Sequence, residues 1–338
     1  MVAPRVHYSL LTGAFVQDYE PLRVYIYKSG SLPHVMLNPI AKALLHDDPR
    51  FQEGRWLYEL TTDPDAADIL TPPYDVAYFE DRIDELQSAL PHYSGAAERH
   101  VFFDSRDDPA IPDFLAESVF LKASLHSAAA GPRRVCLPYT ERIDNFFPRF
   151  AEEPELRYDV SFVGEVSQTR EPIIAAVRAS GLRARVVDRR QNYYGPPQLR
   201  GADRLETAGT PQRTKWRKEF LDITMRSRFV LAVPGYGLNS FRFYEALSLG
   251  VPPLLIDENA ALPFPQHINY DEFCLRLSLS DDNLSESIKG AVEAVGDERW
   301  QQMRKLARHT FDTYLSTFNL LFLLYQAIRE STAVGPLK

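Results

Sequence analysis

The stretch Phe229–Phe264 reads FVLAVPGYGLNSFRFYEALSLGVPPLLIDENAALPF, and its pattern decides the fold. It opens with a wholly apolar run, Phe229–Val233, which is typical of a strand buried on both faces of a parallel sheet. A Pro-Gly-Tyr-Gly turn follows, and Ser240–Leu249 has the spacing of an amphipathic helix that ends at Gly250. A second apolar run at Pro253–Asp257 predicts the next strand. This order of strand, helix and strand is typical of an α/β domain.

The turn and the start of this helix have the chemistry of an anion site. Gly235 and Gly237 allow a tight turn and bring main-chain N–H groups close to a ligand. The N–H groups and the dipole of the helix start favour a phosphate, and Arg242 adds a charged donor fork in the first helical turn. Glu245 shares a face with Arg242 and would hold ribose hydroxyls. The alternative is an Arg–Glu surface pair after an ordinary connection, and the residues alone favour neither reading.

The same alternation of strands and helices extends over the rest of the chain. We predict strands at Arg23–Tyr27, Asp68–Leu70, His100–Asp104, Arg134–Leu137, Tyr158–Val163 and Arg183–Asp188. We predict helices at Val35–Leu45, Thr169–Ser180, Thr210–Met225, Asp282–Val295, Asp297–Thr310 and Phe311–Glu330.

The 338 residues suit two domains. A loop-like segment with Pro148 and Pro154 is the expected boundary. We therefore expect an acceptor-side domain over 1–150, a ligand-binding domain over 151–305, and a C-terminal helical segment over 306–338 that crosses back onto the first domain. Two α/β domains of this kind would enclose a central cleft, where ligands usually bind.

Composition excludes several classes of protein. A net charge of −8 argues against nucleic-acid binding, although residues 151–230 carry 15 basic and 11 acidic residues, a local +4 that would attract an anionic ligand. Cys136 and Cys274, the only cysteines, are expected to be reduced core residues. Met1–Tyr8 is too polar for a signal peptide, and no apolar run approaches the roughly 20 residues of a spanning helix. We expect a cytoplasmic protein with peripheral membrane association as an option; the alternative is a soluble lumenal domain of an anchored enzyme.

Several short motifs resemble the donor-site signature of the exostosin family of glycosyltransferases. They are Ser240–Leu247 (SFRFYEAL), Gly250–Pro253 (GVPP), Leu262–Phe264 (LPF), Ile268–Tyr270 (INY), and Phe162-Val163-Gly164 followed by Arg170. The resemblance continues thinly into the first half, where Arg99 stands in place of the family's Asp before His100. It implies a GT-B fold, that is, two Rossmann-like α/β domains, and an inverting enzyme that uses a nucleotide sugar.

The resemblance also implies roles for individual residues. The donor, expected to be a UDP-sugar, would contact Gly164, Arg170, Pro234, Gly235, Gly237, Asn239, Ser240, Arg242, Glu245 and Asp257. Arg242 would neutralise the leaving diphosphate, so no metal cofactor is expected. The acceptor would be a glycan or a lipid-linked chain, and its hydroxyl needs a general base. Asp75, His100 and Asp104 are the candidates, and the sequence does not choose among them; the oligomeric state is also open.

Three rival interpretations are weaker. Asp104-Ser-Arg-Asp-Asp108 offers an Asp-x-Asp metal arrangement, but Arg106 would place a cation beside the metal. A dinucleotide-dependent oxidoreductase would need Gly-x-Gly-x-x-Gly, which the Pro234–Gly237 turn lacks. A catalytically silent exostosin-like partner, or a nucleotide-binding protein without transferase activity, is the remaining alternative.

Overall fold

The computed structural model describes residues 6–9, 14–17, 20–28, 37–79, 83–139, 155–189, 211–257 and 259–332. The chain divides into two compact units. The first unit comprises Met1–Glu141, Ala260–Ile268 and Asp312–Lys338, and the second comprises Arg142–Asn259 and Asn269–Phe311. The domain boundary expected near residue 150 lies outside the described residues.

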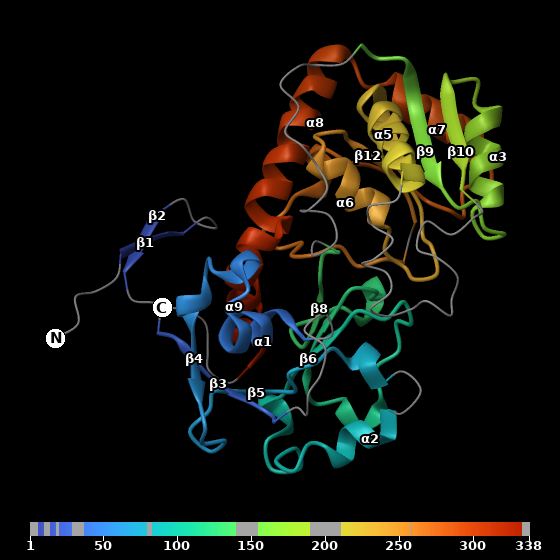
Figure 1. Cartoon of the computed structure of the whole chain (residues 1–338). Coiled ribbons are helices and arrows are strands. Elements are labelled where there is room, and N and C mark those ends of the chain that lie inside the picture. Colours follow the sequence, from blue (N-terminus) through green and yellow to red (C-terminus); the bar gives the residue numbers. More distant parts are fainter. Residues whose placement is uncertain are drawn as a thin grey trace. The chain divides into compact units, whose positions relative to one another are not determined.

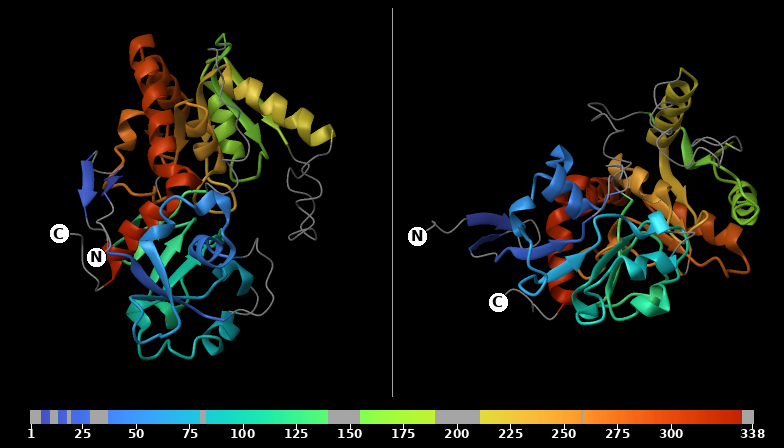
Figure 2. Two further views of the ribbon diagram at one scale, coloured as in Figure 1. Left: turned by 60° about the vertical axis from the view of Figure 1, so that its left-hand side comes forward. Right: turned by 60° about the horizontal axis from the view of Figure 1, so that its bottom comes forward.

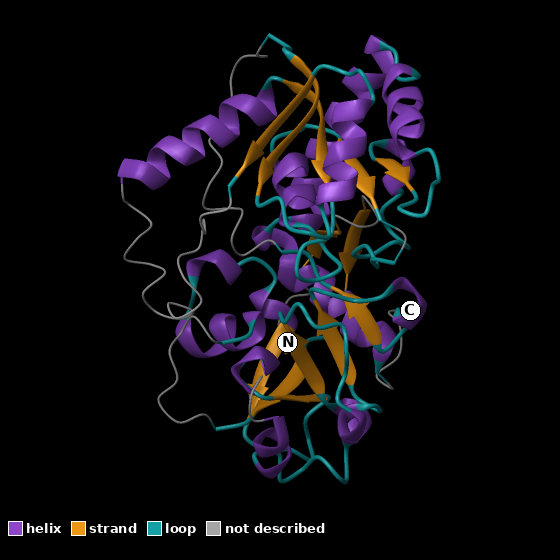
Figure 3. Cartoon of the chain, turned by 90° about the vertical axis from the view of Figure 1, so that its right-hand side faces the viewer, coloured by secondary structure: helices purple, strands orange, loops and turns teal. Residues whose placement is uncertain are grey.

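The second unit is built on a parallel sheet whose strand order is β10-β9-β11-β12-β13. The strands are β9 (Tyr158–Gly164), β10 (Ala184–Asp188), β11 (Ser227–Ala232), β12 (Pro253–Ile256) and β13 (Leu275–Leu277). The helices are α3 (Glu171–Ala179), α5 (Pro211–Met225), α6 (Phe241–Ser248), α7 (Leu284–Glu293) and α8 (Asp297–Thr310), and they lie to both sides of the sheet (Figure 3). Every residue of β12 is buried, as the apolar run predicts. Strand β13 was not predicted, because its side chains are only partly buried and Arg276 interrupts its apolar pattern.

The first unit contains two short parallel sheets and a hairpin (Figure 1). The first sheet has the order β4-β3-β5, and the second β6-β7-β8. Their strands are β3 (Leu22–Ile26), β4 (Tyr58–Thr61), β5 (Ile69–Thr71), β6 (Val101–Asp104), β7 (Val119–Lys122) and β8 (Arg134–Cys136). A parallel bridge between Leu70 and His100 joins the edges of the two sheets. The hairpin is β1 (Val6–Ser9) with β2 (Ala14–Gln17), and the helices are α1 (Pro39–His46), α2 (Ile83–Ser88) and α9 (Leu320–Ser331).

These two units, each with parallel strands and helices, confirm the α/β fold class. The strands β4 and β7 were missed: the exposed Leu60 breaks the alternation of β4, and β7 ends in a lysine. Cys136 and Cys274 are both free and buried, as expected. In the described parts of the chain, no helix is long and apolar enough to span a membrane.

The single helix predicted over Phe311–Glu330 is wrong in its first part. A π-helical turn covers Phe311–Leu315, a 3-10 turn covers Thr317–Asn319, and only then does α9 begin. Both interruptions follow from side chains that compete for backbone carbonyls. The hydroxyl of Ser316 and the amide of Asn319 both donate to the carbonyl oxygen of Asp312, at 3.2 and 2.8 Å.

Helix α9 completes the core of the first unit, which confirms that the C-terminal end of the chain packs on the first domain (Figure 2). Its buried side chains pack with those of β3, β5, β6 and β7; they are Leu320, Leu321, Leu324, Tyr325 and Ile328. The hydroxyl of Tyr58 donates to the carbonyl oxygen of Leu321 at 2.8 Å, and that of Tyr325 donates to the carbonyl oxygen of Glu20 at 2.7 Å. Residues some 300 positions apart are therefore held in one core.

A cavity-forming substitution in α9 should destabilise the protein. Leu324 is fully buried, so Leu324→Ala should lower the free energy of unfolding by about 2–5 kcal/mol, measured by urea denaturation. Phe318→Ala is the control, because Phe318 is 58% exposed and its loss should cost less than about 0.5 kcal/mol. Equal effects of the two changes would contradict a core role for α9.

Candidate active site

The predicted donor residues lie in loops at one edge of the second sheet. Parallel strands place their carboxyl ends at the same edge, so the loops after β9, β11 and β12 are neighbours there. Gly164 closes β9, Pro234–Gly237 follows β11, and Asp257 follows β12. The topology therefore brings together residues that lie up to about ninety positions apart in the chain.

Arg170, at the start of α3, links two of these loops. Its Nε donates to the carbonyl oxygen of Pro234 at 2.8 Å, and its Nη1 donates to the carbonyl oxygen of Glu165 at 2.9 Å. The guanidinium also lies over the ring of Phe162, 5.7 Å from its centre. Within the described residues it forms no ion pair with a carboxylate. Burial, and then the nearby charge of Arg242, lower the pKa of Arg170.

Gly235 allows Arg170 to approach the turn. A Cβ atom on Gly235 would come 2.7 Å from Nη2 of Arg170, so the guanidinium would have to shift. The backbone φ of Gly235 is not among the positive values of the described residues, so the glycine gives space and not an unusual dihedral angle. The turn is tight, as expected, because the N–H of Gly235 donates to the carbonyl oxygen of Gly237 at 3.1 Å.

Arg242 and Glu245 form an ion pair on α6, with side chains 17% and 15% exposed. Nε of Arg242 donates to the carbonyl oxygen of Val163 at 2.5 Å, and the guanidinium lies 4.8 Å from the ring centre of Phe220. The pair is thus mostly buried and tied to the end of β9. The reading as a surface pair does not fit this burial, and in this structure the carboxylate of Glu245 is engaged with Arg242.

The remaining donor candidates lie along the same edge. Asn239 and Ser240 are both buried, and Ser240 precedes α6 without forming a side-chain cap hydrogen bond. The N–H of Phe243 donates to the carbonyl oxygen of Ser240 at 3.1 Å within the first turn of the helix. Asp257 accepts a hydrogen bond from the N–H of Asn259 at 3.2 Å.

In the first unit, Asp75 is a half-buried carboxylate held by donors of Ser105 and Ala77. Its Oδ1 accepts from the N–H of Ala77 at 2.8 Å, and the N–H of Ser105 lies 3.0 and 3.1 Å from its two oxygens. No cation among the described residues pairs with it. Burial raises the pKa of Asp75 to about 6; the charge of Asp104 adds to this, while the N–H bonds oppose it.

Asp104 is fully buried between two cations. Its carboxylate forms ion pairs with Arg106, at 2.8 Å, and with the ammonium of Lys122. Both oxygens are therefore occupied, which disfavours Asp104 as a general base and also disfavours the Asp-x-Asp metal arrangement. Across the described part of the chain, no three His, Cys, Asp or Glu side chains gather closely enough to hold a metal ion.

His100 lies at the opposite end of β6 from Asp104 and is completely buried. Its Nδ1 lies 2.7 Å from the carbonyl oxygen of Ala96, and its Nε2 accepts from the hydroxyl of Tyr27 at 2.8 Å. Burial lowers the pKa of His100 to about 4, so the ring is neutral. These contacts make His100 a core residue and disfavour it as a base. Of the three candidates, only Asp75 is both accessible and unpaired.

The family model named Exostosin GT47 domain matches residues 19–290, which is most of the chain. The protein belongs to this family. It is 29% identical over 105 residues to an Exostosin-1 homolog of Caenorhabditis elegans, a match that covers 31% of this chain and 27% of that protein. It is 27% identical over 95 residues to a probable glycosyltransferase of Arabidopsis thaliana, covering 27% of this chain and 20% of the other. The matches thus span about a quarter of these relatives or less.

The structure also has distant matches among solved structures. One is a glycosyltransferase from Rickettsia africae, with 11% identity and a TM-score of 0.42 over 89% of this chain and 83% of that one. Another is AviGT4, a glycosyltransferase of avilamycin A biosynthesis, with 13% identity and a TM-score of 0.43 over 91% of this chain and 97% of that one.

Two residues near the candidate sites of this exostosin-family chain were not predicted from the sequence. Tyr236 stands between Gly235 and Gly237 and is 82% exposed. Its ring therefore borders the sheet edge that carries the predicted donor residues, which we call the donor edge. An aromatic residue between two glycines after a buried strand is the signal that would have found it. Lys122 is fully buried beside Asp104, and no local pattern distinguishes it from a lysine at a strand end.

The pKa of Asp75 predicts how stability depends on pH. The folded protein binds this proton more tightly than the unfolded chain, because about 6 lies above the ordinary value of 3.8. Asp75 therefore reduces stability as the pH rises from about 4 to 6, and the reduction is complete above that. Asp75→Asn should raise the melting temperature by about 2–4 °C at pH 7.5, by clearly less at pH 4.5, and hardly at all near pH 3.

Asp68→Asn is the control with the opposite sign. Although burial opposes it, bonding to Arg23 keeps the pKa of Asp68 below its ordinary value. Its contribution to stability is present at neutral pH and lost in acid, so this change should lower the melting temperature at pH 7.5. A lower melting temperature for Asp75→Asn at pH 7.5 would contradict the raised pKa of Asp75.

Proposed function

We propose that this protein is an inverting glycosyltransferase that transfers a sugar from a nucleoside diphosphate, in the first instance UDP, to a hydroxyl of a glycan or lipid-linked acceptor. The proposal rests on the family and on one observation in particular. The guanidinium of Arg170, which has no carboxylate partner within the described residues, lies against the backbone of Gly235, six residues before the start of α6.

The donor edge suits a diphosphate for electrostatic reasons. The charge of Arg242 lowers the pKa of Arg170, so the two guanidinium groups repel each other. A bound anion would relieve this repulsion. Glu245 forms an ion pair with Arg242, whereas the hydrogen bonds of the Arg170 guanidinium go to carbonyl oxygens, and the charge of Glu165 acts on it without an ion pair. The positive end of the α6 dipole lies at the same edge. Two guanidinium groups and a helix terminus are the donors that stabilise a leaving diphosphate.

The reaction needs a base for the acceptor hydroxyl, and we assign this role to Asp75. Asp75 takes the hydroxyl proton as the acceptor oxygen bonds to the anomeric carbon. The bond from that carbon to the diphosphate oxygen breaks in the same step, and the charge it leaves is neutralised by Arg170 and Arg242. Attack opposite to the leaving group inverts the anomeric centre. A carboxylate with a pKa of about 6 is a stronger base than an ordinary Asp and is still ionised at neutral pH.

Nucleotide binding tests the donor site. By calorimetry, the wild type should bind one nucleoside diphosphate, with UDP tested first. Arg170→Ala should weaken that binding by about 10–100-fold, the value of a charged hydrogen bond to phosphate. Gly235→Ala should weaken it as well, because its Cβ displaces the guanidinium. Addition of a chelator should leave binding unchanged, since we propose that arginine and not a metal ion neutralises the diphosphate.

Arg178→Ala is the matched control, because Arg178 is an exposed arginine on the same helix, α3. It should bind the nucleotide as the wild type does. If the wild type binds no nucleotide, the donor-site proposal fails and a catalytically silent member of the family becomes the better reading.

Substitution of Asp75 tests the base. Asp75→Asn should lower kcat by about 10²–10⁴-fold and leave nucleotide affinity unchanged, because it removes proton transfer and not donor binding. The release of nucleoside diphosphate is measured with a panel of nucleotide sugars and oligosaccharide acceptors. Since Asp75→Asn is expected to be stable at neutral pH, misfolding would not explain the loss. Full activity of this variant would contradict the role of Asp75 as the base.

A further inference from the structure

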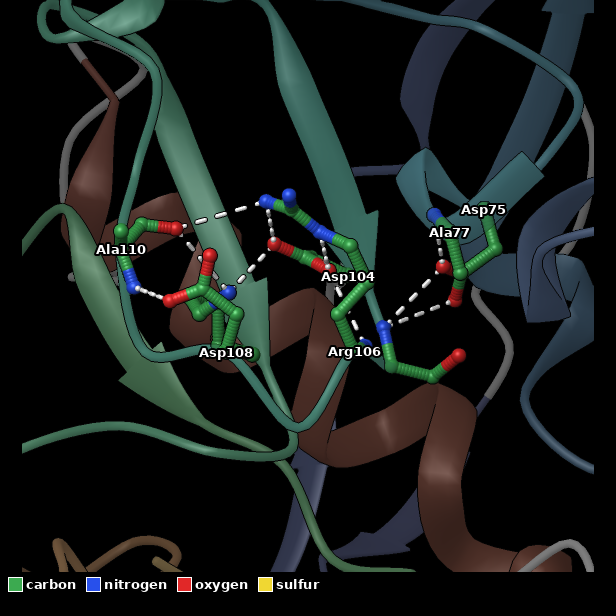
Figure 4. A network of polar contacts seen from close by, with 8 residues as sticks. Asp75, Ala77, Asp104, Arg106, Asp108 and Ala110 are labelled. Atoms are coloured by element: carbon green, nitrogen blue, oxygen red, sulfur yellow. Dashed lines mark hydrogen bonds and ion pairs between the residues drawn. The ribbon is translucent and has the colours of Figure 1, made fainter. Parts of the chain in front are cut away.

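Three charged side chains are buried together where β6 and β7 end: Asp104, Arg106 and Lys122 (Figure 4). The side chains of Asp104 and Lys122 are 0% exposed, and that of Arg106 is 9% exposed. We call these three residues the Asp104 cluster. Asp104 and Lys122 are opposite each other on paired parallel strands, so the sheet register itself brings the two charges together.

The Asp104 cluster closes a tight turn after β6. The carboxylate of Asp104 accepts from the backbone N–H of Arg106 at 3.1 Å, and the side chain of Arg106 folds back to donate to the same carboxylate at 2.9 and 2.8 Å. The Nζ of Lys122 donates to it from β7. The one residue between Asp104 and Arg106 is Ser105, and its peptide is therefore fixed on both sides.

The fixed peptide is the one that contacts Asp75. The N–H of Ser105 lies 3.0 and 3.1 Å from the two oxygens of Asp75, so it donates to the carboxylate as a shared hydrogen bond. The loop that follows is also ordered by backbone contacts: the side chain of Asp108 accepts from the N–H of Ala110, whose carbonyl oxygen lies 3.4 Å from Nη2 of Arg106. Asp75 therefore contacts the turn that the Asp104 cluster closes (Figure 4).

Stability alone is a weak reason for such a cluster. Taking three charges out of water costs several kcal/mol per ion, and apolar residues of similar size would often stabilise a fold as well. The cost is visible at Lys122, since burial lowers the pKa of its ammonium even though Asp104 and Asp108 oppose this. A buried ion cluster is better explained by the geometry and the charge distribution that it imposes.

The charge distribution matters because Arg106 belongs to the turn that Asp75 contacts and Lys122 bonds to the residue that opens it. Both donate to Asp104, whereas the donors to Asp75 are the uncharged groups of Ser105 and the N–H of Ala77. A carboxylate paired with arginine or lysine is a poor base, because the cation stabilises its ionised form. Because Arg106 and Lys122 are paired with Asp104, they do not pair with Asp75 and do not weaken it as a base.

We propose that the Asp104 cluster is a positioning device for Asp75. It holds the Ser105 N–H against the carboxylate, and it confines the charges of Arg106 and Lys122 to Asp104, so that Asp75 stays unpaired and accepts the acceptor's proton. This inference rests on the proposed role of Asp75 as the base, but it concerns residues that do not themselves touch the reacting atoms.

The direct test is titration of Asp75 by NMR on full-length protein labelled with carbon-13 at the aspartate carboxyl. The Asp75 signal is identified by its absence in Asp75→Asn. Asp104→Asn removes a negative charge and leaves two cations unbalanced, so the pKa of Asp75 should fall by about one pH unit. Lys122→Met and Arg106→Gln each remove a cation and leave Asp104 in place, so the pKa should rise by a similar amount. Asp68→Asn, which changes an exposed pair in the same unit, should leave it unchanged.

Shifts of opposite sign are the signature of this device, because loss of packing alone would not reverse direction with the sign of the removed charge. If Asp104→Asn does not fold, Lys122→Met and Arg106→Gln still decide the matter, and Arg106 is the most exposed of the three. No shift, or shifts in one direction only, would overturn the proposal. If the shifts occur but Asp75→Asn keeps full transferase activity, the positioning of Asp75 stands and its role as the base fails.

Discussion

The contact between the guanidinium of Arg170 and the backbone of Pro234 and Gly235 organises the donor edge of the second unit. It ties the loop after β9 to the loop after β11, which are adjacent strands of the same sheet. The planar guanidinium donates to the carbonyl oxygen of Pro234 and lies against Gly235, whose lack of a side chain leaves room for it. The N–H groups at the start of α6, the ion pair of Arg242 with Glu245 and the exposed ring of Tyr236 all lie on or beside the turn that this contact positions.

The two units leave groups of opposite charge without an ion-pair partner among the described residues. In the second unit, Arg170 is left without a carboxylate partner among the described residues, which prepares the donor edge for an anion. In the first unit, Arg106 and Lys122 form ion pairs with the buried Asp104, and Asp75 has no cation partner among the described residues. Unpaired charge is costly wherever it is partly buried, so both arrangements reduce stability locally, which is the cost expected of groups with the roles we propose.

The predicted fold followed from patterns that are local in the chain. Continuous apolar runs located β9, β11 and β12, and helical spacing located α6 and α8 with errors of one or two residues at the ends. The failures have physical causes as well. Strand β7 ends in Lys122, whose buried charge is compensated by its cross-strand partner Asp104. Ser316 and Asn319 interrupt a long apolar helix because their side chains donate to the carbonyl oxygen of Asp312. The segment Ala260–Ile268 joins the first unit through Leu125 and Cys136, contacts that no pattern reveals.

For the site, the sequence by itself determined the chemical inventory: a glycine turn before a helix, two arginines, and three candidate bases that it could not rank. It also indicated the family, because the motifs between residues 240 and 270 follow one another closely in the chain. Only the tertiary structure decided which of the candidate residues are buried or paired. In the folded protein His100 is buried in the core, Asp104 is paired with two cations, and Asp75 is only half-buried. The missing side chain of Gly235 leaves room for the guanidinium of Arg170. Accessibility and pairing depend on neighbours distant in the chain, which residue identity and spacing do not encode.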